Sequence, residues 1–369
     1  MPKLYFTDED WARIERDTMA WWEGELERPL VNLAVTDPAT KPGTFEFLTN
    51  FPLSMPVEDV LDRYEPLFAS TRYYGDAFPW WWLNFGAGMV AGFLGARVHS
   101  VIDPSETVWF SPPRNRELKD IHLTYNPENV WWKRVKEMTA ASVRRWGGRL
   151  AVSHADLGGN LDILASFRTT EGLLYDLVEH PDQVRQQVAE TTRLWLRYFD
   201  ELDAIIRSTC RGTSCWTPIW STGTTYMLQC DFSYMISPLM FERFVMPDLV
   251  ACCEHLSHAF YHLDGRGEIP HLDLLLSIER LRGIQWIPGD GSRPPQEWLP
   301  LLKRIRDGGK RCQVFVTPEG ARTIVKALGG KGFLLVIQHD NQEFMQPERA
   351  RAFLKTLAQE DVSQTKRVF

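Results

Sequence analysis

A histidine and an aspartate lie two residues apart at the end of an apolar segment, a pattern that could bind a metal ion. The segment Ala259 to Tyr261 leads into His262 and Asp264 and then into glycines, which predicts a buried strand that ends in polar residues. Residues i and i+2 of a strand project to the same side, with Cα atoms roughly 7 Å apart. The two side chains are therefore candidate metal ligands, with a simpler alternative in which His262 only forms hydrogen bonds and Asp264 caps its glycine turn.

The sequence supplies further candidates for this site. His339, or Gln338 in the other register, is the candidate third ligand and would complete a set of two histidines and one carboxylate. Such a set accepts zinc, iron or manganese, and we expect a divalent ion, zinc first. Asp156 follows a predicted strand and, with His262, is a candidate catalytic residue, whereas we expect Asp162 to have a structural role, either as a cap or in a pairing contact.

Five residues at or near predicted strand ends are candidates for substrate binding, although packing in an aromatic core would explain the aromatic ones equally well. They are Trp220, Tyr226, Asp231, Gln285 and Trp286.

Eight predicted strands alternate with predicted helices, several of which open at a proline. The strands begin near residues 31, 97, 150, 213, 259, 284, 312 and 333, and a helix precedes the first of them. This alternation predicts an α/β fold, a (β/α)8 TIM barrel with an N-terminal helical extension, in one domain over residues 1–369. The active site would then lie at the carboxyl ends of the strands.

Composition excludes several classes of protein. The net charge of −7 argues against a nucleic-acid partner, and the acidic, aromatic N-terminus argues against a signal peptide and for a cytoplasmic location. The 6 cysteines form no CxxC pair, which favours free thiols. The apolar segment at residues 80–96 is short for a membrane span, so we expect a buried helix, with Trp80 to Trp82 along a wall.

Three segments resemble the uroporphyrinogen decarboxylase superfamily, which includes zinc-dependent methyltransferases that act with methyl-corrinoid proteins. They are ADLGGNLDILASFRTTEGLLYDLVEHPDQV, WSTGTTYMLQCDFSYMISPLMFERFVMPDL, and YHLDGRGEIPHLD followed by GIQWIPGDG. The resemblance covers most of the chain from about residue 25 and implies the barrel. It also implies methyl transfer between a small methyl donor or acceptor and a corrinoid.

Departures from the family patterns narrow this resemblance. The decarboxylases carry an arginine-rich N-terminal motif, where this chain has Arg28 alone, so porphyrinogen decarboxylation is disfavoured. The methyltransferases carry His-x-Cys where this chain has His262-Leu263-Asp264, and a second cysteine where it has Gln338 or His339. No DxHxxG motif for cobalamin is present, so a corrinoid would be held by a separate protein.

Other functions stay open at this point. A lyase of the decarboxylase type, or a hydrolase, could act on a small carboxylate or sugar-like substrate at the same strand ends. A binding protein without catalysis is a further alternative, and a homodimer is compatible with all three readings.

Overall fold

The fold is organised around one mainly parallel sheet. In a computed structural model, residues 4–40, 47–100, 107–114 and 117–365 are described. Seven strands form the sheet in the order β2-β1-β13-β12-β11-β10-β9, in which only β2 runs antiparallel to its neighbour. Their bounds are β1 Leu30–Thr36, β2 Thr71–Gly75, β9 Thr225–Leu228, β10 His258–Asp264, β11 Leu281–Ile287, β12 Arg311–Val316 and β13 Phe333–Ile337.

Six shorter strands form three pairs beside this sheet. β3 (Trp80–Trp81) runs parallel to β6 (Ala151–Val152), β4 (Arg97–His99) pairs with β5 (Trp109–Ser111), and β7 (Thr213–Ser214) pairs with β8 (Trp220–Ser221). The predicted mixed α/β fold with parallel strands is therefore confirmed. Among the described residues, the hydrogen-bonded strand order does not close into an eight-stranded barrel.

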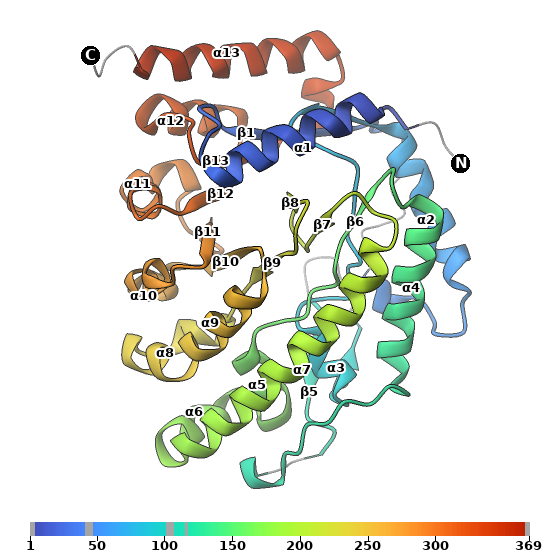
Figure 1. The fold of residues 1–369 in the computed structure, drawn as a ribbon, viewed down its shortest axis with the longest axis vertical. Coiled ribbons are helices and arrows are strands. Elements are labelled where there is room, and N and C mark those ends of the chain that lie inside the picture. The colour runs from blue at the N-terminus through green and yellow to red at the C-terminus, as the bar shows by residue number, and fades with distance from the viewer. Residues whose placement is uncertain (1–3, 41–46, 101–106, 115–116, 366–369) are drawn as a thin grey trace.

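The described part of the chain contains thirteen α-helices, which surround the strands. In Figure 1, α10, α11 and α12 lie beside β10 to β13 at the left of the view, α13 crosses the top, and α4 lies at the right. The bounds are α1 Asp8–Glu23, α2 Val57–Ser70, α3 Met89–Phe93, α4 Val130–Trp146, α5 Asn160–Arg168, α6 Thr170–Glu179, α7 Pro181–Arg207, α8 Pro238–Phe244, α9 Met246–His255, α10 Leu272–Ser277, α11 Leu299–Asp307, α12 Pro318–Leu328 and α13 Pro347–Thr365.

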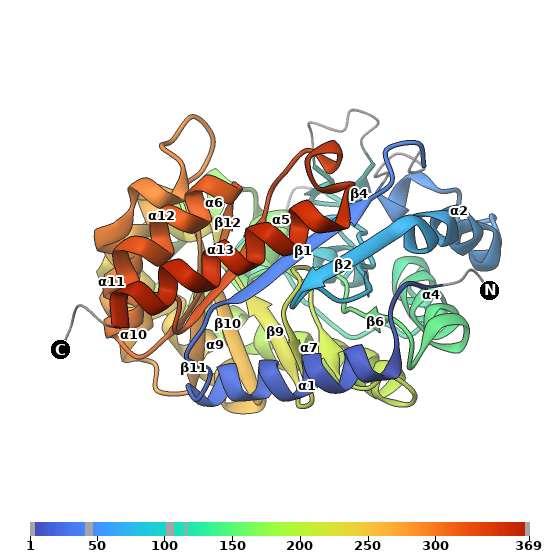
Figure 2. The same cartoon turned by 90° about the horizontal axis from the view of Figure 1, so that it is seen from above.

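The predicted N-terminal helix is present and covers the amino ends of the parallel strands. Thr7 and Asp10 form a reciprocal capping box that starts α1. At its other end, the Trp21 indole donates to the carbonyl of Phe333, and the side chains of Arg282 and Arg311 donate to the carbonyls of Trp22 and Trp21. Because these partners begin β13, β11 and β12, α1 closes one end of the sheet and leaves the carboxyl ends for a site (Figure 2).

Several predicted elements differ from the structure. The strand predicted near residue 97 is one arm of the β4–β5 hairpin, and those near 150 and 213 are short strands outside the main sheet. The alternation predicts helix between the strands near residues 213 and 259, but Thr225–Leu228 of this segment forms β9, in which every residue is buried. Continuous burial removes the alternation that identifies a strand, so this segment could not be distinguished from a buried helix.

The apolar segment at residues 80–96 is largely buried, but only Met89–Phe93 is helical. None of the helices that the structure describes combines the length and the apolar character that a membrane-spanning segment needs. All 6 cysteines are free thiols, as predicted.

Candidate functional site

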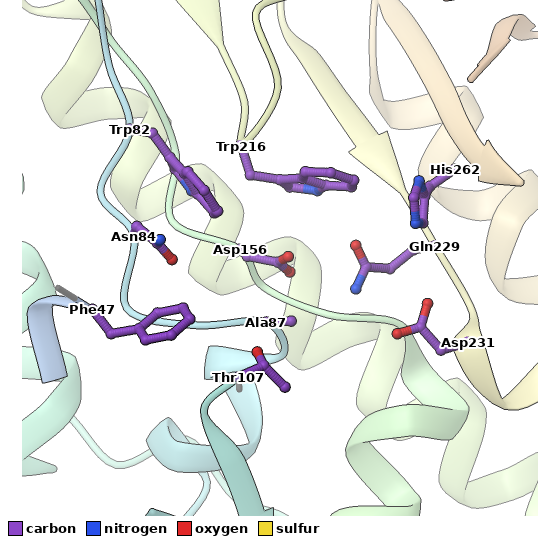
Figure 3. Close-up of a pocket in the computed structure, with 10 residues that line it drawn as sticks. All are labelled: Phe47, Trp82, Asn84, Ala87, Thr107, Asp156, Trp216, Gln229, Asp231 and His262. Atoms are coloured by element: carbon purple, nitrogen blue, oxygen red, sulfur yellow. The ribbon is translucent and has the colours of Figure 1, made fainter. Parts of the chain in front are cut away.

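A cavity of about 440 Å³ lies at the carboxyl ends of β6, β9 and β10. Aromatic side chains line one part of it, and carboxylates with one histidine line the other (Figure 3). The residues that line it are Phe47, Trp82, Asn84, Ala87, Thr107, Asp156, Trp216, Gln229, Asp231 and His262. The prediction of polar side chains at the carboxyl strand ends thus coincides with a cavity large enough for a small molecule.

Three ligand-type side chains meet at the polar end of this cavity. His262 and Asp264 come from the end of β10, and Asp231 begins the 3-10 helix η3 (Asp231–Met235) that follows β9. One ligand atom of each lies within 4.8 Å of the others, and His262 Nε2 is 3.9 Å from Asp264 Oδ2. Such spacing suits three ligands of a single metal ion.

Gln285 orients the ring of His262. The Gln285 amide donates through Nε2 to Gln313 Oε1 at 2.7 Å, which leaves its Oε1 to accept from His262 Nδ1. With this assignment of the amide, the proton of the neutral imidazole is on Nδ1, and the lone pair of Nε2 faces Asp264. A histidine that ligates a metal needs this arrangement, in which the second nitrogen is held by a hydrogen bond.

Asp162 places Asp231 at the cavity. Its carboxylate accepts hydrogen bonds from the backbone N–H groups of Asp231, at 3.1 Å, and Phe232, at 2.7 Å. These N–H groups are at the start of η3, so the capping role expected for Asp162 is present. The same contacts fix the backbone from which the Asp231 side chain enters the cavity.

Asp156 lies at the centre of the cavity wall, in the loop after β6. Its Oδ1 accepts from the N–H groups of Gly158, at 2.9 Å, and Gly88, at 3.3 Å. The two glycine backbones approach so closely that a Cβ on Gly158 would lie 2.5 Å from the Gly88 Cα, which requires glycine there. Tyr226 holds the same loop, because its hydroxyl accepts from the Leu157 N–H at 2.7 Å.

The carboxyl groups around the cavity are held away from bulk water. Burial raises the pKa of Asp162 to about 8, and the nearby charge of Asp231 adds to this shift. Burial also raises the pKa of Asp156 to about 7. Two backbone hydrogen bonds oppose this second shift, and the charge of Asp231 adds to it. Burial of its carboxyl group also raises the pKa of Asp231, and part of this side chain stays accessible from the cavity. A cation in the cavity would offset the repulsion between these carboxylates and favour their ionised form.

The ligand set fits a metal of borderline or hard character. Asp231, His262 and Asp264 offer two oxygens and one nitrogen and no thiolate, which suits zinc, manganese or iron with positions left for water or substrate. The predicted set of two histidines and one carboxylate differs from this group. His339 lies after β13, where its Nε2 donates to the Ala34 carbonyl at 3.0 Å, and Gln338 is exposed beside it.

Four of the residues predicted to bind substrate do not line the cavity. Gln285 lies behind His262, Tyr226 holds the Asp156 loop, and Trp286 packs against Trp298 on the other face of β11. Trp220 lies toward the opposite end of the sheet, where its ring packs against Trp11, because the chain reverses after β7 and runs back as β8. Asp231 does line the cavity.

Sequence reasoning missed most of the aromatic wall. Trp216 follows β7 by two residues and lines the cavity, whereas the sequence predicts Trp220 at or near the end of this strand. The prediction that Trp80 to Trp82 line a wall applies to Trp82, whereas Trp81 packs in the core against Tyr64. Phe47 carried no signal in the sequence.

Arg28 is not available to grip a substrate. Its guanidinium forms a paired contact with the buried carboxylate of Asp76, at 2.7 and 2.9 Å, and a further bond of 2.9 Å to Asp17. Bidentate pairs of this kind hold an arginine firmly in place. This geometry agrees with the sequence argument against porphyrinogen decarboxylation.

Comparison with known proteins finds matches in fold but not in sequence. No protein-family model matches the chain, and no curated protein matches its sequence. Among solved structures, a methyltransferase from Methanosarcina mazei has a similar fold, with a TM-score of 0.60 and 11% sequence identity. The match covers 94% of this chain and 98% of that one, so the two folds agree over almost their whole length.

Proposed function

We propose that the protein is a metal-dependent, methyltransferase-like enzyme that moves a methyl group between a small substrate and a corrinoid held by a separate protein. The observation that carries this proposal is the group of Asp231, His262 and Asp264 at one end of a cavity of small-molecule size. The fold likeness to a methyltransferase and the resemblance of the sequence segments to the uroporphyrinogen decarboxylase superfamily support it.

The residues in and around the cavity have separate tasks in this proposal. Asp231, His262 and Asp264 would hold a divalent ion, zinc first, which supplies Lewis-acid polarisation of a substrate heteroatom. Gln285 keeps the Nδ1 proton of His262 in place, so that Nε2 faces the ligand group. Asp156, whose pKa is raised to about 7 chiefly by burial, can hold or release a proton near neutral pH.

We also propose that the short strands complete a barrel-like wall of the kind found in that superfamily. Backbone hydrogen bonds support this, because Ser153 donates to Trp81 at 2.9 Å and His154 donates to Ser214 at 3.2 Å, which links β3, β6 and β7 in sequence. A cytoplasmic location and a homodimer stay predictions from the sequence.

Metal analysis of the purified protein tests the proposal. We expect about one divalent ion per chain, and we expect Asp264→Ala to lower metal content and methyl transfer together while the protein stays folded. Asp273→Ala is the matched control, because this aspartate lies on α10 with an exposed side chain that pairs with Arg304 outside the cavity. Wild-type protein without metal, with activity that a chelator leaves intact, would contradict the proposal.

A second candidate is a lyase of the decarboxylase type, or a hydrolase, on a small carboxylate or sugar-like substrate. The position of Asp156 favours it, since a buried carboxyl with a raised pKa is a suitable general acid. Activity that survives metal removal but is lost in Asp156→Asn would favour this candidate over methyl transfer.

A further inference from the structure

Two indole rings of the cavity are fixed in place. The Trp216 indole donates to the Met227 carbonyl at 3.0 Å, and its ring meets His262 edge to face, with centroids 5.1 Å apart. Trp82 stacks on Trp80 with centroids 6.2 Å apart, and the Trp80 indole donates to the Cys215 carbonyl at 3.1 Å. These two rings are therefore preorganised, and together with Phe47 they form the aromatic wall of the cavity (Figure 3).

The charged side chains beside this wall are acidic. Asp156 lies between the aromatic side chains and Asp231 in Figure 3, and both of its backbone hydrogen bonds are to Oδ1. Its second oxygen is thus free to face a ligand. No lysine or arginine is among the described residues that line the cavity.

We propose that the aromatic wall of Phe47, Trp82 and Trp216, with Asp156, binds a quaternary ammonium group. Aromatic faces attract cations through the ring quadrupole, and aromatic cages bind methylated ammonium groups in this way. The inference rests on the proposed function, in which the small substrate carries methyl groups, and it names that substrate as an N-methylated ammonium compound. The ammonium group would lie on the aromatic side of the cavity, and a heteroatom of its substituent would reach the metal ligands, because a quaternary nitrogen has no lone pair for a metal ion.

A quaternary group fits this wall better than a primary ammonium group. A primary ammonium has three N–H donors that need acceptors, whereas a quaternary nitrogen has none and its methyl groups pack on ring faces. Anionic head groups are disfavoured by Asp156 and Asp231. The cavity volume of about 440 Å³ holds a compact head group with a short substituent.

The reaction of such a substrate balances with the proposed partner. The corrinoid of the partner protein would supply, in its reduced form, the nucleophile that accepts the methyl group, so the new bond to the methyl carbon would replace its C–N bond. The electron pair of the broken bond stays on nitrogen, so a tertiary amine leaves.

Calorimetry with a charged probe and its neutral isostere tests the inference on the wild-type protein. Choline and 3,3-dimethylbutan-1-ol have nearly the same shape, and only choline is charged. With chelator present and no partner protein, we expect choline to bind at least about 10-fold more tightly, which corresponds to about 1.4 kcal/mol. Equal binding of the two probes, or no binding of choline, would overturn the inference.

Variants identify the wall as the site. Trp82→Leu should weaken choline binding about 10-fold, Asp156→Asn should weaken it several-fold, and Trp82→Phe should keep most of it. Trp109→Leu is the matched control, because this tryptophan is 64% exposed on the β4–β5 hairpin and does not line the cavity. Circular dichroism checks that each variant is folded, and unchanged affinity in folded Trp82→Leu would contradict the assignment.

The two proposals fail in different ways. Choline binding without any methyl transfer would leave the ammonium site standing and remove the proposed function. Methyl transfer from another donor in a protein that does not bind choline would keep the function and remove the ammonium inference.

Discussion

Two histidines of β10, His258 and His262, lie four residues apart on the same face of the strand and have different environments. His258 begins the strand, where its Nδ1 is 2.8 Å from Ser221 Oγ and its Nε2 is 3.9 Å from Glu23. His262 lies near the strand end, with Gln285 at Nδ1 and Asp264 at 3.9 Å from Nε2. Each ring thus has a polar partner on one nitrogen and a carboxylate on the other.

The two histidines differ in what covers their ends of the strand. Trp22 of α1 stacks on the His258 ring with centroids 4.5 Å apart, and burial lowers the pKa of His258 to about 4, so this ring is neutral at pH 7 and shielded from solvent. The His262 ring instead lines the cavity. A similar pair of partners therefore gives a sealed packing contact at one end of β10 and a candidate metal ligand at the other.

The largest effect on stability is expected when Trp22, which covers the amino end of β10, is removed. Trp22 is fully buried, stacks on His258 and donates from its indole to the Trp220 carbonyl. Trp22→Ala should lower the free energy of unfolding by about 3–5 kcal/mol, because it leaves a cavity in the core. Urea unfolding measures this change, and Trp82→Ala in the cavity wall, where the ring is only half-buried, should cost clearly less. Similar losses in the two variants would remove the distinction between the ends.

Separate substitution of each histidine by glutamine is the next test. His262→Gln should weaken divalent metal binding by about 100-fold, or about 2.7 kcal/mol, with little change in the free energy of unfolding. His258→Gln should leave metal affinity unchanged and lower stability by about 1 kcal/mol, through loss of the contact with Ser221. Calorimetric titration with zinc or manganese, together with urea unfolding of both variants, checks the pair. Equal metal affinity in the two variants would place the ligand group elsewhere.

The carboxyl at the cavity centre should make stability depend on pH. The pKa of Asp156 is raised from 3.8 to about 7 by burial, so the folded protein keeps a proton that the unfolded chain loses. Stability therefore falls as the pH rises from about 4 to 7, and Asp156→Asn should be more stable than wild type above that range, by on the order of 1–3 kcal/mol.

Unfolding of both proteins between pH 4 and 8 measures this difference. Asp273→Asn is the control, because its carboxyl is exposed and its difference from wild type should stay nearly flat. A constant difference for Asp156→Asn across the whole range would contradict the raised pKa.

The smallest effect concerns the orientation of His262. Gln285→Leu removes the acceptor for Nδ1 and should weaken metal binding about 10-fold, since contacts behind a ligand typically contribute 10- to 100-fold. Gln285→Glu keeps an acceptor at this position and should retain most of the affinity. Metal titration distinguishes these outcomes, and equal affinities in wild type and Gln285→Leu would show that the ring is held by other contacts.

Much of the architecture could be predicted from the sequence because it depends on local patterns. The capping residue Thr7, the prolines that open α12 and α13, and the apolar segments that form β10 to β13 are each visible over a few residues. The pairing of His262 with Asp264 could also be predicted locally, because the period of two along a strand places both side chains on one face whatever surrounds them.

Only the tertiary structure decided which other residues join them. Asp231 reaches His262 because β9 pairs with β10 and Asp162 caps the turn that follows, whereas His339 is turned toward Ala34 after β13. Trp220 and Trp216 are four residues apart, yet the reversal between β7 and β8 sends them toward opposite ends of the sheet. Pairing of distant strands and reversal of short ones depend on contacts across the whole chain, so the members of the site follow from packing and not from spacing in the sequence.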